Sequence, residues 1–128
     1  MEGLSNLFRG NGYTTINGAQ VKNILNDSNI VILDVRNPGE YRNGHIPKAI
    51  NIPINEIQGR LSEISLYRNS AILVYCASGS RSIKAADFLS RNGFKKIYNL
   101  SRGISSYKGT LSRSEERRVG KECRSRWS

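Results

Sequence analysis

The feature that most constrains the fold is an apolar run near the middle of the chain, Ile72–Tyr75, which ends at a cysteine. No polar residue alternates with the apolar ones, and this is typical of a strand buried on both faces inside a parallel sheet. After Cys76 the chain passes through small residues and Gly79 into residues 82–89, where apolar side chains recur at helical spacing. A strand, a tight turn and a helix are therefore expected, with the cysteine in the turn.

A cysteine at this position faces the backbone N–H groups of its own loop and the positive end of the helix dipole. Both favour the thiolate over the thiol, as does the nearby guanidinium of Arg81. Gly79 lets the backbone curl without a Cβ clash. The pattern indicates a reactive sulfur at Cys76. The alternative is an inert buried cysteine that packs as a small hydrophobe, and this segment alone does not decide between the two.

The other segments alternate between strand and helix patterns. We expect further strands at residues 13–16, 30–34, 49–52 and 96–100. We expect helices after Asn17, from Pro38, after Asn55 with Ile57, Leu61 and Ile64 on its buried side, and over 103–108. Such alternation predicts an α/β fold, with right-handed crossovers and a parallel sheet that helices cover on both faces. Ligands bind such sheets at the carboxyl ends of the strands, where both Cys76 and Asp34 are expected.

The chain has 128 residues, which suits one domain with a core of its own. Its two cysteines, Cys76 and Cys123, do not have the spacing of a metal site, so we expect no metal and no other cofactor. No apolar run approaches the roughly 18 residues that span a bilayer. The first residues also lack the basic and apolar regions of a secretory signal. A cytoplasmic, reducing location without a membrane partner or a disulfide is therefore expected.

The end of the chain differs in composition from the rest. Residues 113–128 have no apolar period and resemble the conceptual translation of a DNA sequencing adapter, so we interpret them as a non-native tail. We expect a flexible segment over 1–12 and the folded domain over 13–112. The tail holds six Lys/Arg and three acids, so without it the net charge falls from +10 to +7. That excess favours anionic small substrates or acidic partners. Basic and aromatic residues do not interleave as a nucleic-acid surface requires.

Three groups of residues, in order and at normal spacing, resemble the rhodanese domain. Motifs within Ile32–Pro53 resemble its first signature, Val74–Ser82 its active-site loop, and Asn99–Lys108 its closing motif. Family members often have a glycine where this chain has Arg102 and a tryptophan where it has Tyr107. The resemblance implies a rhodanese-like fold of five parallel strands flanked by helices. It also implies sulfurtransferase activity through a cysteine persulfide.

On this resemblance Cys76 is the nucleophile and sulfur carrier. Its thiolate attacks the sulfane sulfur of thiosulfate or of a persulfide donor and becomes a persulfide, which a second thiophile discharges. Because the native part has no second cysteine, the acceptor is external: a thiol, cyanide, or a protein that relays sulfur. The negative charge is expected to be stabilised by the loop that binds the persulfide, formed by Ala77, Ser78, Gly79, Ser80 and Arg81.

Other polar residues near the expected site have supporting roles. We expect Asp34 to accept hydrogen bonds from neighbouring loops and Arg36 to pair with a carboxylate. Arg81 either binds an anionic donor or steadies the loop, and we favour a supporting role. His45 falls in a turn that is structural in the family.

A cysteine-dependent phosphatase and a non-catalytic interaction module are the two alternative functions. Cysteine-dependent phosphatases have five residues between cysteine and arginine, whereas only four separate Cys76 from Arg81, and the phosphatase position is Ser82. A shorter loop encloses a smaller space, which suits a sulfur atom better than a phosphoryl group. A non-catalytic interaction module is the second alternative, and the retained cysteine argues against it. A persulfide carrier that serves a partner protein lies between enzyme and module.

Overall fold

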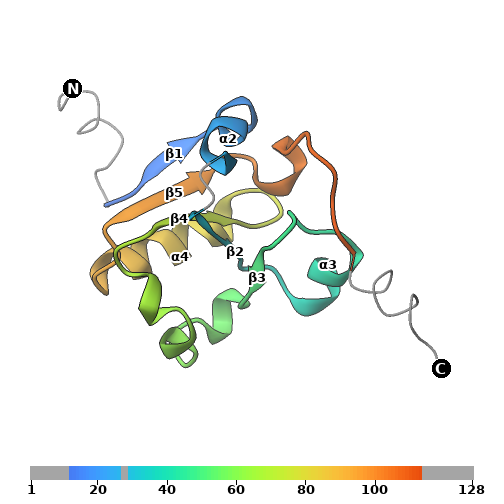
Figure 1. The fold of residues 1–128 in the computed structure, drawn as a ribbon. Coiled ribbons are helices and arrows are strands. Elements are labelled where there is room, and N and C mark those ends of the chain that lie inside the picture. The colour runs from blue at the N-terminus through green and yellow to red at the C-terminus, as the bar shows by residue number, and fades with distance from the viewer. Residues whose placement is uncertain (1–11, 27–28, 114–128) are drawn as a thin grey trace.

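The computed structural model describes residues 12–26 and 29–113 of the chain. Five parallel strands form one sheet in the order β1-β5-β4-β2-β3, as the sequence predicts (Figure 1). The central strand β4 pairs with β2 on one side and β5 on the other. The strands are β1 (Thr14–Ile16), β2 (Val31–Asp34), β3 (Ile50–Asn51), β4 (Ala71–Tyr75) and β5 (Lys96–Leu100).

Helices cover both faces of this sheet. Helix α4 (Ser80–Arg91) packs on one face together with the 3-10 segments η1 (Ile54–Glu56), η2 (Leu61–Glu63) and η3 (Ser65–Tyr67). Helix α2 (Gly18–Leu25) and the segment η4 (Gly103–Ser106) pack on the other. Successive residues of β4 enter the two cores alternately, which explains why the strand carries no polar alternation. None of the helices in the described ranges has the length and apolar character needed to cross a membrane.

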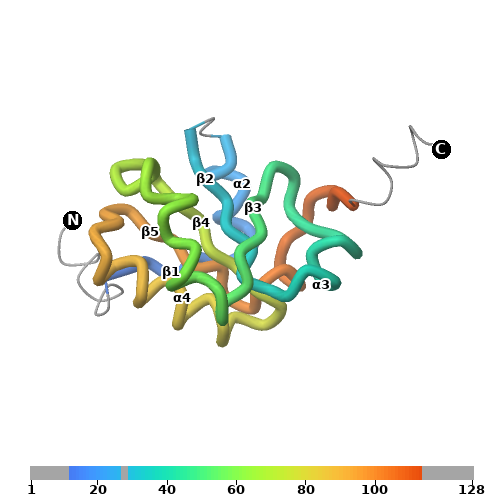
Figure 2. The backbone as a smooth tube through the Cα atoms, turned by 90° about the horizontal axis from the view of Figure 1, so that it is seen from below, coloured from blue at the N-terminus to red at the C-terminus, as the bar shows by residue number. Residues whose placement is uncertain are grey.

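Helix α3 (Pro38–Asn43) lies at one end of the sheet, beside the last described residues (Figure 2). There His45 pairs with Ser112 through two backbone hydrogen bonds, and the Arg113 guanidinium donates to the carbonyl of Asn43 at 3.0 Å. The contacts of the domain therefore reach Arg113, one residue beyond the predicted boundary. Residues 114–128, which include Cys123, and the expected flexible segment up to residue 11 lie outside the described residues.

Local sequence sets two of the helix starts. Asn17 caps α2 by accepting a hydrogen bond from the backbone of Gln20, whose side chain bonds back to Asn17. Asn37 and Glu40 form the same reciprocal box at α3, with Pro38 in the first turn. These caps satisfy N–H groups that the first helical turn leaves unpaired.

The predicted helix after Asn55 is wrong. The chain instead forms η1, η2 and η3, and Asn55 lies inside η1 rather than at a helix cap. Of the three positions expected on the buried side, Ile57 and Ile64 are 4% and 0% exposed, and Leu61 is partly buried. Their spacing marks the side that faces the core, but Gly59 and the amides that bond three residues back favour short 3-10 turns over a continuous helix.

A buried polar network joins the carboxyl ends of β2 and β4. The Asp34 carboxylate accepts hydrogen bonds from Arg36 Nε at 3.0 Å, Arg36 Nη2 at 2.7 Å and Tyr75 Oη at 2.7 Å. Tyr75 Oη accepts from the amide of Ile46 at 3.0 Å, and Arg36 Nη2 also donates to the carbonyl of Gly44. Burial, followed by the Asp34 charge, raises the pKa of Tyr75, which keeps its hydroxyl a donor. The network thus fixes the loop after α3 to the sheet.

We predict that Tyr75→Phe lowers the free energy of unfolding by about 1–3 kcal/mol, because Asp34 and the Ile46 amide each lose a buried partner. Urea unfolding measures this loss. The matched control is Tyr67→Phe, which removes a hydroxyl with no hydrogen bond in the described part of the chain and should stay within about 0.5 kcal/mol of the native protein. Equal effects of the two variants would contradict the structural role of the network.

Candidate active site

The expected cysteine loop connects β4 to α4. Helix α4 begins at Ser80, two residues before the predicted start, so Ser80 and Arg81 lie in its first turn. Gly79 is the N-cap residue, with a φ of +110°, in the left-handed region that favours glycine. A Cβ at Gly79 would also lie 3.3 Å from the backbone nitrogen of Arg102. The loop can therefore close around Cys76 only with glycine here.

The Cys76 sulfur is fully buried and surrounded by hydrogen-bond donors. The amides of Gly79 and Ser82 donate to Sγ at 3.0 and 3.3 Å, and Ser82 Oγ lies 3.6 Å from it. Burial opposes ionisation, but the Ser82 side chain and the amides of Ser82, Gly79 and Ser78 outweigh it and lower the pKa of the Cys76 thiol. The arrangement favours a thiolate at a position shielded from water.

The donors differ in part from those that the sequence predicts. Gly79 and Ser78 belong to the predicted loop, whereas Ser82 lies one residue beyond it. Within the described ranges, Ala77, Ser80 and Arg81 make no hydrogen bond to Sγ. The helical turn explains this, since it directs the amides of residues three and six positions after Cys76 back toward the sulfur.

Ser82 connects the sulfur to a second buried polar residue. Its hydroxyl lies 2.5 Å from Asn99 Oδ1 and 3.1 Å from the carbonyl of Gly79. Asn99, on β5, is 1% exposed. Neither Ser82 nor Asn99 is among the site residues that the sequence predicts. The sequence does contain one signal for this contact. Asn99 is a polar residue in the buried part of the last strand, and a buried side-chain amide needs a hydrogen-bond partner.

Arg81 points to α3 rather than to the sulfur. Its Nη1 and Nη2 atoms lie 3.0 and 3.2 Å from the carboxylate oxygens of Glu40. The hydrogen bond from Arg81 lowers the pKa of Glu40, so the pair is charged at neutral pH. Of the two roles expected for Arg81, this geometry favours steadying the loop, because the guanidinium is already engaged.

The remaining predicted residues lie around the site without contacting Sγ through a described hydrogen bond. Asp34 and Arg36 pair with each other, as described above. His45 is buried, stacks on Tyr41 with ring centroids 3.7 Å apart, and has Nδ1 2.7 Å from the Tyr41 carbonyl. These contacts stabilise the loop that follows α3.

The start of η4 packs against the backbone of the cysteine loop. The amide of Ile104 donates to the Cys76 carbonyl at 2.8 Å. Gly103 has a φ of +61°, and a Cβ there would lie 2.3 Å from the same oxygen and 2.6 Å from Ala77. Two of the three segments that carry the resemblance, the cysteine loop and the closing motif, therefore lie in contact.

The family model for the rhodanese-like domain matches residues 17–110 of the chain. The chain belongs to the rhodanese-like domain family. A rhodanese-related protein from Thermoplasma volcanium shares 38% sequence identity and a TM-score of 0.65, covering 74% of this chain and 90% of that one. An E. coli structure described as rhodanese with anions shares 29% identity and a TM-score of 0.61, covering 66% of this chain and 99% of that one.

Two curated relatives extend this rhodanese-like comparison. The tRNA uridine(34) hydroxylase of Buchnera aphidicola subsp. Baizongia pistaciae is 38% identical over 98 residues, which is 73% of this chain and 31% of that protein. The putative sulfur carrier protein YrkF of Bacillus subtilis is 39% identical over 83 residues, which is 65% of this chain and 44% of that protein. The chain thus spans less than half the length of either relative.

We predict that Ser82→Ala raises the pKa of Cys76, because the thiolate loses a hydrogen bond that stabilises its charge. A higher pKa means less thiolate at neutral pH. The pH–rate curve for alkylation of Cys76 by iodoacetamide should therefore shift to higher pH. Peptide mass spectrometry separates Cys76 from Cys123. Ser80→Ala, which changes an exposed hydroxyl in the same turn, should leave the curve in place. An undisplaced curve for Ser82→Ala would contradict the assignment.

Proposed function

We propose that the protein is a sulfurtransferase that moves sulfane sulfur through a persulfide on Cys76. The thiolate attacks the outer sulfur of thiosulfate, a new S–S bond forms, and the old S–S bond breaks with its electron pair leaving on sulfite. Cyanide or a thiol then attacks the outer sulfur of the persulfide. That step gives thiocyanate or a new persulfide and returns the Cys76 thiolate.

The observation that carries this proposal is the convergence of donors on one sulfur. The amides of Gly79 and Ser82 are fixed at 3.0 and 3.3 Å from Sγ by the start of α4, before any charge develops. Donors held in place in this way stabilise a charged sulfur without reorganisation. A non-catalytic interaction module does not need backbone amides that converge on one sulfur atom.

A persulfide carrier that delivers sulfur to a partner protein is the second candidate. The similarity to a putative sulfur carrier protein supports it. In both functions the intermediate is the Cys76 persulfide. They differ in the acceptor.

We predict that the protein gains one sulfur atom on Cys76 after exposure to thiosulfate, and that it forms thiocyanate when cyanide is added. Cys76→Ser should abolish both while leaving the circular dichroism spectrum and the melting temperature nearly unchanged. Cys123→Ser is the matched control and should keep both activities. Mass spectrometry of the intact protein and a thiocyanate assay give the readouts. Thiocyanate formation by Cys76→Ser, or no added sulfur on the native protein, would refute the proposal.

The length of the loop gives a separate prediction. With four residues between Cys76 and Arg81, the amides converge on a single atom and would leave the oxygens of a phosphoryl group without donors. Each unpaired polar atom in a closed site costs about 1–3 kcal/mol. We therefore expect negligible hydrolysis of aryl phosphates by the protein. Hydrolysis faster than thiocyanate formation would show that loop length does not select the chemistry.

A further inference from the structure

Two non-glycine residues in the described ranges, Lys48 and Arg102, have a positive φ, and both are cationic. This left-handed conformation costs a side-chain-bearing residue strain, so it needs a cause. At Lys48 the cause is local: the Ala49 amide donates to the Ile46 carbonyl at 3.0 Å, closing a turn whose second residue is Pro47 and whose third, Lys48, takes the positive φ. At Arg102 the positive φ belongs to the turn between β5 and η4, where Arg102 is the N-cap residue of η4.

Arg102 begins the turn that supports the cysteine loop. Two residues after Arg102, the amide of Ile104 donates to the Cys76 carbonyl at 2.8 Å and joins this turn to the loop. The Arg102 backbone nitrogen lies 3.3 Å from the position of a Cβ on Gly79. The strained backbone therefore places an arginine directly beside the loop that surrounds the sulfur, at the carboxyl edge of the sheet.

The Arg102 side chain is exposed and lines a hollow of about 460 Å³ between the first turn of α2 and η4. Lys108 lines the same hollow, and no acidic residue does. The nearby hydroxyls are engaged, since Ser105 Oγ donates to the Arg102 carbonyl and Ser106 Oγ to the Ser101 carbonyl. Arg102 and Lys108 are the charged residues among those that line this hollow.

Neither cation has a carboxylate partner among the described residues. Every acidic side chain in the described ranges is already paired with an arginine: Asp34 with Arg36, Glu40 with Arg81, Glu56 and Glu63 with Arg60, and Asp87 with Arg91. Arg81, the cation that the sequence places nearest to Cys76, is therefore engaged. Arg102 and Lys108 are left as the charges available to a ligand beside the loop.

We propose that Arg102 and Lys108 form an anion-binding site beside Cys76 that holds the oxyanion group of the sulfur donor. The nature of the ligand rests on the proposed sulfur transfer, whereas the site itself does not. A donor such as thiosulfate carries a sulfonate next to its sulfane sulfur, so a cation beside the loop attracts the sulfonate as the sulfane sulfur meets Sγ. The backbone strain at Arg102 is the cost of placing the charge there.

The test compares two alkylating reagents of similar size at Cys76, anionic iodoacetate and neutral iodoacetamide. Both react with the same thiolate, so the ratio of their rates cancels any change in the pKa of Cys76 and reports the local charge. Arg102→Gly should lower the iodoacetate-to-iodoacetamide ratio by about three- to tenfold, as expected for losing one nearby, partly solvated cation. Arg102→Lys should keep most of the ratio. Peptide mass spectrometry confines the measurement to Cys76.

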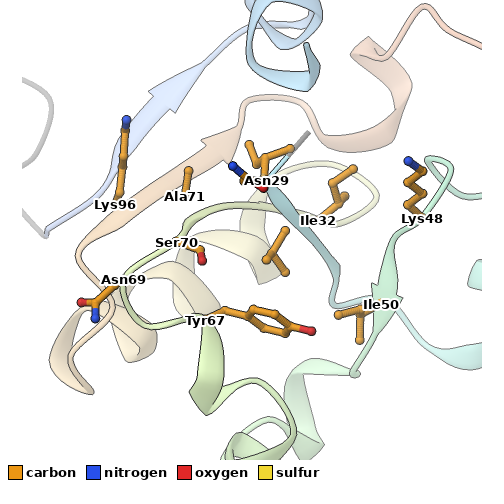
Figure 3. A pocket seen from close by; sticks show the side chains of 11 residues that line it. Asn29, Ile32, Lys48, Ile50, Tyr67, Asn69, Ser70, Ala71 and Lys96 are labelled. Carbon is orange, nitrogen blue, oxygen red and sulfur yellow. The ribbon is translucent and has the colours of Figure 1, made fainter. Parts of the chain in front are cut away.

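Lys48→Gly is the matched control. It removes the same charge and relieves the same backbone conformation, but Lys48 lies at the amino ends of the strands, where it lines another hollow with Tyr67 and Lys96 (Figure 3). It should leave the ratio unchanged. Both glycine variants should melt within a few degrees of the native protein, because the relieved strain offsets the added flexibility of the unfolded chain.

A second arm measures sulfur transfer. Arg102→Gly should raise KM for thiosulfate by a similar factor and change kcat little, because the lost cation acts on binding of the donor. An Arg102→Gly ratio equal to that of the native protein, or an equal fall in Lys48→Gly, overturns the anion site. If the native protein forms no persulfide with thiosulfate, the proposed function fails, and the alkylation ratio still decides the site.

Discussion

A sulfur atom that carries charge away from water needs hydrogen-bond donors that are fixed before it ionises, and the rest of this structure depends on that constraint. The donors are the amides of Gly79 and Ser82, and their position depends on where α4 begins. That start requires the left-handed φ of Gly79, which the neighbouring Arg102 backbone leaves no room to replace. The pKa of one thiol therefore depends on the packing of a whole helix against β4.

The elements around the loop keep that helix start in place. Arg81, in its first turn, is tied to α3 through Glu40. The loop that follows α3 is tied to the sheet through Asp34, Arg36 and Tyr75. The two sets of contacts form a continuous path from the cysteine loop to the end of β2. These charged residues thus hold the backbone in place, and the sulfur is stabilised by neutral groups, the Ser82 hydroxyl and the backbone amides.

The sequence predicts the sheet, because a strand buried on both faces has a pattern that few other elements share. It predicts the cysteine loop because strand end, small residues and helix follow within ten positions. It predicts the type of helix less well wherever the side-chain spacing is compatible with two backbone hydrogen-bond patterns. Ile57 and Ile64 mark the side that faces the core both in an α-helix and in 3-10 turns, and Gly59 favours the turns.

The contact between Ser82 and Asn99 could not be predicted for a different reason. The two residues are brought together by the packing of α4 over β5, and no local pattern encodes that register. The same packing decides which amides face Sγ, so Ser82 replaced Ala77 and Ser80 as a donor. Local sequence thus locates the reactive residue, while the residues that tune it are set by tertiary contacts.

The pairing of Arg81 with Glu40 also bears on which charge the site can stabilise. In a loop whose arginine faced inward, a guanidinium fork would match an oxyanion with several charged oxygens. Here the fork faces a carboxylate and the amides of Gly79 and Ser82 converge on one atom. Such a site stabilises a single charge on a single sulfur, and any oxyanion on the same substrate has to be held outside the loop. A cation beside the loop, where Arg102 lies, meets that requirement without a larger cysteine loop.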